Sequence, residues 1–291
     1  MNRNKVVSIG FMIFPGFPMS AVTSMIEPLR AANEITGEDA FKWTIVSEDG
    51  DRVMSSAGVA FEATRPVDNL NGLDLLFLLS SPVGRFENEK SGNGALRHLA
   101  RHGGVVGAIS GGIFPLTRSG LMDGHTCSVH WCYAAAFRKE FPDMAASDEV
   151  VVLDRRRHTA SGAAAAFDLA LYMIEERLGE DVATEVACWF QHPLVRRQGV
   201  RQRIPTNGKP SVSDMLPRTV RNAIALFADS IETPISVAEV AISVGVSSRQ
   251  MERQFIKATG KGPLHYYRSL RMKAARQLIQ YSNNSMPQVA S

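Results

Sequence analysis

The chain has 291 residues, of which 45% are hydrophobic and 21% charged, so it is long enough for two globular domains. No apolar run reaches the roughly 18 residues of a membrane-spanning helix, and three cysteines supply no disulfide framework. These features, and an N-terminus without a signal-peptide hydrophobic region, exclude membrane-spanning and disulfide-stabilised secreted classes and predict a cytoplasmic protein.

Strand and helix patterns alternate through the first two thirds of the chain. Nearly continuous apolar runs predict buried strands, and amphipathic segments predict helices. The predicted strands are residues 5–14, 41–47, 73–79, 104–109, 126–131, 149–153 and 159–161, with a short hairpin at 53–62. The predicted helices are residues 19–35, 94–102, 113–120, 132–141 and 162–178, with another ending near 191. The alternation predicts an α/β doubly wound parallel sheet with helices on both faces.

Ligands of such sheets bind at the carboxyl ends of the strands, and several polar and aromatic side chains are expected at this rim. The candidate ligand-binding residues are Phe14, Phe17, Ser80, Ser81, Ser110, Gly111, His130 and Trp131. Aromatic rings here would suit a cationic head group such as a quaternary amine. Ordinary core packing of the phenylalanines is the favoured alternative.

Ser110 lies where a predicted strand turns directly into a helix, as in a nucleophile elbow. A serine needs an adjacent base to act as a nucleophile at neutral pH. His130 is the candidate base, but no carboxylate near it in the sequence would orient its ring. The structural alternatives are a helix N-cap for Ser110 and a hydrogen-bonded, partly buried side chain for His130.

Cys127, His130 and Cys132 are close together in the sequence. They lack a fourth ligand and the usual zinc spacing, so we expect ordinary thiols, no metal and no cofactor.

Four motifs give the first 195 residues a family resemblance: 14–17 (FPGF), 27–33 (EPLRAAN), 108–112 (AISGG) and 119–124 followed by His130-Trp131. They resemble the class I glutamine-amidotransferase-like (ThiJ/PfpI) fold found in the GlxA-type branch of AraC regulators. The enzymes of this fold carry Cys at the elbow and an acid early in the first helix, where this chain has Ser110 and residues 21–24 (AVTS).

These two departures predict a non-catalytic, ligand-sensing domain. The resemblance implies a small nitrogen-containing effector, such as an amine, an amino acid or a betaine. The alternative is a PfpI/glyoxalase-like hydrolase with Ser110 as its nucleophile. A possible homodimer is expected through the helix at 162–178 and its successor, although packing of these helices within the domain would equally explain their small apolar residues.

Residues 196–215 are polar, rich in Pro, Gly and Ser, and predict a linker between a domain at 1–195 and one at 216–291. Residues 1–195 hold 17 Lys/Arg and 24 Asp/Glu, a net charge of −7, whereas the linker carries +4 and the last segment +6. Only the C-terminal part is therefore expected to contact a polyanion.

Two short helices around a tight turn are predicted between residues 234 and 260. Ser236 with Glu239 and Ser247 with Gln250 form capping boxes, and Gly245 lies at the turn. This pattern predicts a helix-turn-helix unit. The outer face of its second helix carries the candidate DNA-binding residues Ser248, Arg249, Gln250, Glu252, Arg253 and Lys257.

The sequence from about residue 217 onwards resembles the AraC/XylS transcriptional regulators. The resemblance rests on the spacing of Arg249, Met251, Arg253 and Phe255 and on the motif at 259–263 (TGKGP). In that family, positions matching Arg249, Glu252 and Arg253 contact the major groove. The resemblance implies a regulator that binds promoter DNA.

A second unit of the same kind begins near the end of the chain. Residues 285–290 (SMPQVA) repeat the cap, box partner and Val-Ala of residues 236–241 (SVAEVA) at an offset of 49. AraC-type proteins carry two such units, so we expect a DNA-binding domain cut off at its second helix-turn-helix.

Overall fold

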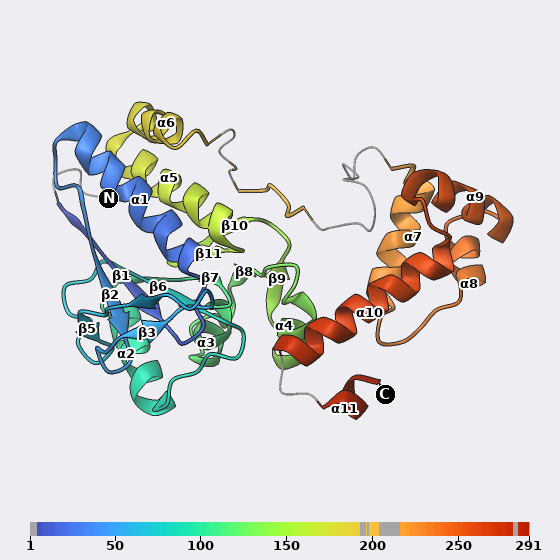
Figure 1. Cartoon of the computed structure of the whole chain (residues 1–291), viewed down its shortest axis with the longest axis horizontal. Coiled ribbons are helices and arrows are strands. Elements are labelled where there is room, and N and C mark those ends of the chain that lie inside the picture. Colours follow the sequence, from blue (N-terminus) through green and yellow to red (C-terminus); the bar gives the residue numbers. More distant parts are fainter. Residues whose placement is uncertain (1–4, 193–195, 197, 204–215, 282–284, 291) are drawn as a thin grey trace. The chain divides into compact units, whose positions relative to one another are not determined.

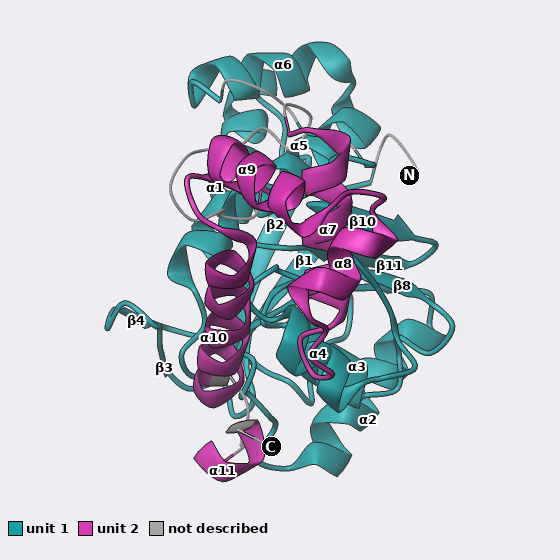
Figure 2. Ribbon diagram, turned by 90° about the vertical axis from the view of Figure 1, so that its right-hand side faces the viewer, with its two compact units in different colours: residues 1–202 teal, residues 203–291 magenta. Residues whose placement is uncertain are grey.

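The computed structural model describes residues 5–192, 196, 198–203, 216–281 and 285–290. The chain divides into two compact units, residues 1–202 (unit 1) and residues 203–291 (unit 2) (Figure 2). Most of the predicted linker, residues 204–215, lies outside the described residues. None of the described helices is long and apolar enough to cross a membrane.

Unit 1 is built on a seven-stranded sheet with the order β10-β11-β7-β6-β1-β2-β5 (Figure 1). Its strands are β1 Val7–Ile13, β2 Phe41–Ser47, β5 Arg65–Pro66, β6 Leu75–Ser80, β7 Val105–Ser110, β10 Val151–Asp154 and β11 Arg157–Ala160. All neighbouring pairs are parallel except β10 and β11. Every residue of β1 and β6 is buried, as the continuous apolar runs predict for central parallel strands.

Helices cover both faces of this sheet. They are α1 Met19–Thr36, α2 Glu89–Arg101, α3 Ile113–Arg118, α4 Ala134–Glu140, α5 Ala163–Leu178 and α6 Glu180–Trp189. Helices α1, α5 and α6 share one core with residues of β1 and β6, while α2 and α3 lie on the other face (Figure 1). The α/β doubly wound prediction is thus confirmed.

Three local details bear on the predictions. The predicted hairpin is present as β3 (Val53–Met54) paired with β4 (Ala60–Phe61). The short strand β8 (Thr126–Ser128) pairs in parallel with β9 (Ala145–Ser147), a strand that the sequence pattern did not predict. Most of α5, the predicted dimer helix, is buried within its own unit, while Tyr172 on it is exposed.

Unit 2 is a bundle of short helices. They are α7 Arg218–Asp229, α8 Val237–Ser243, α9 Ser248–Thr259, α10 Pro263–Tyr281 and α11 Met286–Ala290. Both predicted capping boxes form, and Gly245 adopts a φ of 76° at the turn between α8 and α9. The core is aromatic: Phe227 stacks on Tyr267 with ring centroids 4.5 Å apart and meets the edge of Phe255 at 5.9 Å.

Candidate functional sites

The end of β7 forms a tight elbow in unit 1. Ser110 has a φ of 58°, a conformation that residues other than glycine rarely adopt, and it pairs in register with Ser80 of β6. A Cβ atom at Gly111 would lie 2.4 Å from the Ser80 carbonyl oxygen, and one at Gly112 would lie 1.9 Å from that of Leu78. The two glycines therefore let the elbow press against β6, which forces Ser110 into its strained conformation.

Ser110 does not cap α3, so this structural alternative is wrong. The N-cap position of α3 is Gly112, and no side-chain oxygen bonds to the first turn. Ser110 is 8% exposed. The elbow predicted from the sequence is thus present, with its serine held at the carboxyl edge of the sheet rather than used as a cap.

His130 follows β8 and lies against the start of α5. A Cβ atom at Gly162 would be 3.5 Å from the Cδ2 atom of His130. The Nδ1 atom of His130 lies 2.7 Å from the Cys132 sulfur and accepts the Cys132 backbone N–H at 3.3 Å. Since Nδ1 is an acceptor, the ring proton sits on Nε2 in the neutral form. Burial lowers the pKa of His130, which favours that neutral form.

A Ser–His catalytic pair does not form. The described residues include no hydrogen bond between Ser110 and His130, and no described carboxylate contacts the His130 ring to orient it. Its Nδ1 is instead occupied by the Cys132 thiol and amide. This arrangement departs from the nucleophile–base–orienter geometry of covalent catalysis.

The predicted rim residues fall into two groups. Phe14 and Phe17 are 2% and 0% exposed and pack edge-on against Phe86 and Phe61, so they belong to the core, as the packing alternative states. Ser80 is also fully buried, and its hydroxyl donates to the backbone carbonyl of Ser81 at 2.7 Å. Ser81, His130 and Trp131 remain partly accessible at this edge, whereas Ser110 is buried.

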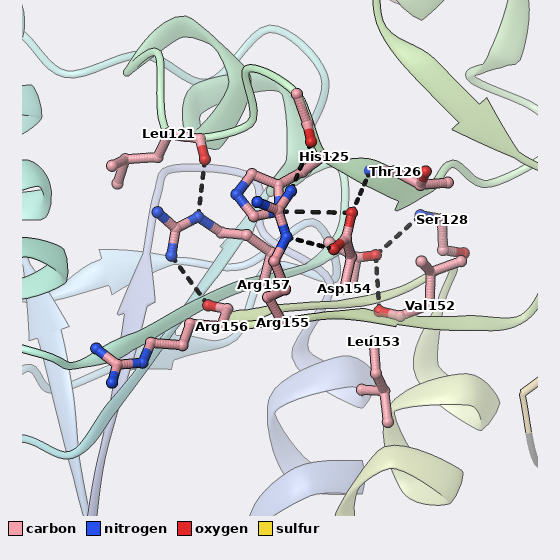
Figure 3. A network of polar contacts seen from close by, with 12 residues as sticks. Leu121, His125, Thr126, Ser128, Val152, Leu153, Asp154, Arg155, Arg156 and Arg157 are labelled. Atoms are coloured by element: carbon pink, nitrogen blue, oxygen red, sulfur yellow. Dashed lines mark hydrogen bonds and ion pairs between the residues drawn. The ribbon is translucent and has the colours of Figure 1, made fainter.

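A polar network fixes the strands that carry His130 (Figure 3). The backbone N–H of Ser128 in β8 donates to the hydroxyl of Thr159 in β11 at 2.8 Å. The Arg155 side chain and the Thr126 backbone N–H both donate to Asp154, and these bonds lower the pKa of its carboxyl to about 2. The sequence carried no signal for this network, because its members lie on three strands joined only by the fold.

The outer face of α9 in unit 2 is exposed at the positions predicted to contact DNA. Met251 and Phe255 are fully buried. All six candidate DNA-binding residues, Ser248, Arg249, Gln250, Glu252, Arg253 and Lys257, are exposed. Among the described residues, Arg249, Arg253 and Lys257 have no hydrogen-bond or ion-pair partner in their side chains. Three unpaired cations on one helix face suit phosphates and guanine edges.

Gln250 and Glu252 differ from these cations. The Gln250 side chain accepts the Ser247 backbone N–H at 2.9 Å as part of the capping box. The Glu252 carboxylate lies against the turn after α9, since a Cβ atom at Gly262 would be 2.4 Å from its Oε1 atom. Gln250 thus has a role within the unit and would have to leave the capping box to reach a base, whereas Glu252 lies close to the backbone of Gly262.

Comparison with known proteins supports both halves of this description. Residues 7–176 match the model of the DJ-1/PfpI family. The HTH-type transcriptional regulator GbdR of Pseudomonas aeruginosa is 33% identical over 290 residues, covering 100% of this chain and 78% of the relative. The regulator GlxA of Rhizobium meliloti is 31% identical over 297 residues, covering 99% and 88%.

A solved structure agrees with these relatives. A crystal structure of an AraC family transcriptional regulator from Pseudomonas putida superimposes with a TM-score of 0.57 at 28% identity. The superposition covers 63% of this chain and 99% of the Pseudomonas putida chain.

Proposed function

Because this chain belongs to the DJ-1/PfpI family and is a DNA-binding transcriptional regulator of the AraC, GlxA-like type, we propose that α9 reads promoter DNA while unit 1 senses a small nitrogen-containing effector. The main support for this proposal is that the polar side chains of the two units differ in exposure and in hydrogen bonding. Among the described residues, the cations of α9 are exposed and unpaired, and no base is hydrogen-bonded to Ser110 at the elbow of unit 1. A chain that acts on DNA works in the cytoplasm, where we place it.

The DNA proposal rests on the geometry of a recognition helix. Arg249 and Arg253 are four positions apart, so they lie on one face of α9 about one helical turn from each other. A guanidinium donates two parallel hydrogen bonds to the O6 and N7 atoms of guanine, and Lys257, one turn further on, suits a phosphate. The buried Met251 and Phe255 anchor the opposite face, so the helix presents these cations without rearrangement.

The DNA proposal is tested by Arg253→Ala, with Arg221→Ala on the exposed side of α7 as the matched control. Genomic fragments enriched by the parent chain serve as the DNA, and fluorescence anisotropy at fixed salt measures affinity. Loss of one bidentate base contact costs about 1–3 kcal/mol, so we expect Arg253→Ala to bind about 10- to 100-fold more weakly. Equal affinity of the two variants for these fragments would overturn the assignment of α9.

The effector proposal rests on what the rim of unit 1 retains. His130 offers a neutral ring whose Nε2–H is a donor, and Trp131 offers a half-buried indole beside it. An aromatic face suits an alkylated ammonium group and a polar donor suits a carboxylate, and both groups occur in betaines and amino acids. A Ser110 hydroxyl without a base supports binding rather than turnover.

A thermal-shift screen of the full chain against glycine betaine, carnitine and arginine tests this proposal. An effector present at 100 times its Kd stabilises the folded state by about 2.7 kcal/mol, which raises the unit 1 midpoint by several degrees. Trp131→Ala is expected to abolish the shift, while Val59→Ala, which truncates an exposed side chain of unit 1, keeps it. A covalent adduct on Ser110 with an ester or glyoxal probe, detected by mass spectrometry, would instead support the hydrolase.

We further propose a homodimer through unit 1. Tyr172 on α5 is 36% exposed, and Trp189 on α6 is 50% exposed. Aromatic side chains are enriched in protein interfaces, so these two suit one. Light scattering of the parent and of Trp189→Asp tests this: a dimer that becomes a monomer supports the proposal, and a monomeric parent contradicts it.

A further inference from the structure

The residues that lead out of unit 1 pair like a short extra strand, through an isolated bridge that lies outside the named strands. The backbone N–H of Val150 donates to the carbonyl of Val200 at 2.8 Å, and that of Gln202 donates to Asp148 at 2.8 Å. Between them, Glu149 and Arg201 form an antiparallel bridge. Residues 198–202 therefore belong to the fold of unit 1, although their composition resembles a linker.

The side chain of Gln202 reaches from this strand to the loop that carries His130. Its Oε1 atom accepts the backbone N–H of Trp131 at 2.9 Å, and its Nε2 atom donates to the carbonyl of Val129 at 2.8 Å. These are the peptide groups on either side of His130. Nε2 also lies 3.3 Å from the carbonyl of Glu149. One amide thus fixes the backbone from which both His130 and Trp131 project.

A second anchor lies just upstream. The side chain of Asp168 on α5 is fully buried and accepts the backbone N–H of Arg196 at 3.0 Å and its guanidinium at 2.8 and 2.7 Å. It also contacts Nε2 of His192 at 3.0 Å. A buried carboxylate with these partners is a firm attachment, because loss of the Arg196 guanidinium would leave its charge without a cationic side chain bonded to both oxygens. Arg196 therefore stays attached to unit 1 when the segment around Gln202 moves.

We propose that Gln202 is a positioning residue of the effector site and couples that site to the segment leading to the DNA-binding unit. A ligand on the Trp131 indole and the His130 ring acts on the two peptide groups that Gln202 holds. It thereby changes how firmly residues 198–202 stay paired with residues 148–150. This inference rests on the proposed effector function, and by reciprocity the pairing of the strand also sets the affinity of the site.

The contact itself is tested without any ligand, by hydrogen exchange followed with mass spectrometry on the full chain. Gln202→Ala is expected to speed exchange about tenfold in peptides covering residues 128–132 and in those covering 198–203, since both lose their shared bonds. Gln198→Ala is the matched control, because among the described residues that side chain donates to the Leu153 carbonyl alone, at 3.0 Å. It is expected to leave residues 128–132 unchanged.

A second substitution keeps the test decisive if Gln202→Ala lowers stability overall. Gln202→Glu retains an acceptor for the Trp131 N–H but turns a carboxylate oxygen towards the Val129 carbonyl, so it is expected to accelerate exchange at residues 128–132 as well. If neither variant changes exchange there while both fold with the parent's midpoint, the proposed coupling is overturned.

Coupling is then measured with whichever of glycine betaine, carnitine or arginine shifts the parent's midpoint. In the parent, the compound is expected to change exchange of residues 198–203 at least threefold, and in Gln202→Ala this response is expected to vanish even at concentrations of the compound that saturate the variant. A bound compound that leaves residues 198–203 of the parent unchanged overturns the inference and leaves the effector proposal standing. If none of these compounds binds, the effector proposal fails, and the ligand-free exchange data still decide whether Gln202 links the loop to the strand.

Discussion

Helix α9 of unit 2 and the elbow of unit 1 hold their polar side chains in opposite ways. On α9, Arg249 and Arg253 project from a regular helix into solvent and have no partner among the described residues. At the elbow, Ser110 is 8% exposed in a strained conformation, and His130 is tied to its neighbour Cys132. The first arrangement suits a ligand that brings its own charge, as DNA does. The second suits a small molecule that must be enclosed.

The two sites therefore depend on different parts of the structure. The face of α9 needs only its caps and a small aromatic core, all within about 50 residues. The rim of unit 1 needs strands from distant parts of the sequence to end at the same edge. Substitutions should therefore damage the two sites by separate routes.

The largest effect is expected from Phe255→Ala, which would break the core under α9. Phe255 is fully buried between Phe227 and Tyr266, with ring centroids 5.9 and 5.7 Å away. Truncation of such a ring costs about 3–5 kcal/mol. Calorimetry is expected to show an earlier transition for unit 2 with that of unit 1 unchanged. Ile256→Ala, at a side chain that is 51% exposed, is the control and should change little. A matching loss in unit 1 would show that the units do not unfold separately.

A smaller effect is expected from Ser247→Ala, which removes the N-cap of α9. The Ser247 hydroxyl accepts the Gln250 backbone N–H at 3.3 Å, and its loss costs about 1 kcal/mol. Urea denaturation of unit 2 measures this change. Ser243→Ala, at an exposed serine near the end of α8, controls for loss of a hydroxyl and should cost less. Equal losses would show that the box does not support the recognition helix.

The elbow should respond in the opposite direction. Ser110→Gly relieves a positive φ, so we expect unit 1 to gain about 0.5–1 kcal/mol while losing affinity for its effector. The control is Ser91→Gly in α2, where glycine has no strain to relieve and should destabilise. If Ser110→Gly instead lowered the stability of unit 1, the serine side chain would stabilise the folded state by more than its positive φ destabilises it.

The smallest expected effect is a difference in pH response between the units. Burial lowers the pKa of His130 below its ordinary 6.5, so the unfolded chain takes up this proton at a higher pH than the folded one. The His130 contribution is therefore fully present above pH 6.5 and is lost as the pH falls below it. Glu239 in unit 2 has its pKa lowered from 4.5 by the Ser236 hydroxyl, so its contribution is lost only at more acid pH.

Urea midpoints at pH 7.5 and 5.5 measure this difference. Unit 1 is expected to weaken at the lower pH, and His130→Gln is expected to reduce the change only in part. The reduction is partial because burial also lowers the pKa of His158. A pH response that is identical in the parent and in His130→Gln would contradict the assignment of a neutral, buried ring.

The difference between the two sites also explains how much the sequence reveals. The caps and faces of α8 and α9 were predictable, because Ser236 with Glu239 and Ser247 with Gln250 are three positions apart and act locally. The elbow at Ser110 was predictable for a similar reason, since a strand, a serine and two glycines follow one another directly. Both the capping boxes and the elbow could be predicted because their residues are close together in the sequence.

Contacts over long sequence separations were not predictable. Gln202 lies 71 positions from Trp131, and no periodic pattern marks a glutamine in a polar, Pro- and Ser-rich segment as part of a sheet. Asp168 falls on a helix of small apolar residues, where only the fold shows that its partner is Arg196. Phe14 and Phe17 were placed at the correct end of β1, but a single sequence does not indicate which way a side chain turns after a strand.

The attachment of Arg196 to Asp168 limits how far the outgoing chain can be released. Gln202 is six positions beyond Arg196, so opening the strand between them moves the point of exit by at most about 20 Å. One turn of B-DNA rises about 34–36 Å. If the exit moved by this full length, its two positions would differ by more than half of that rise. In the proposed dimer, such a shift would admit or deny the two DNA-binding units their half-sites without any change in α9 itself.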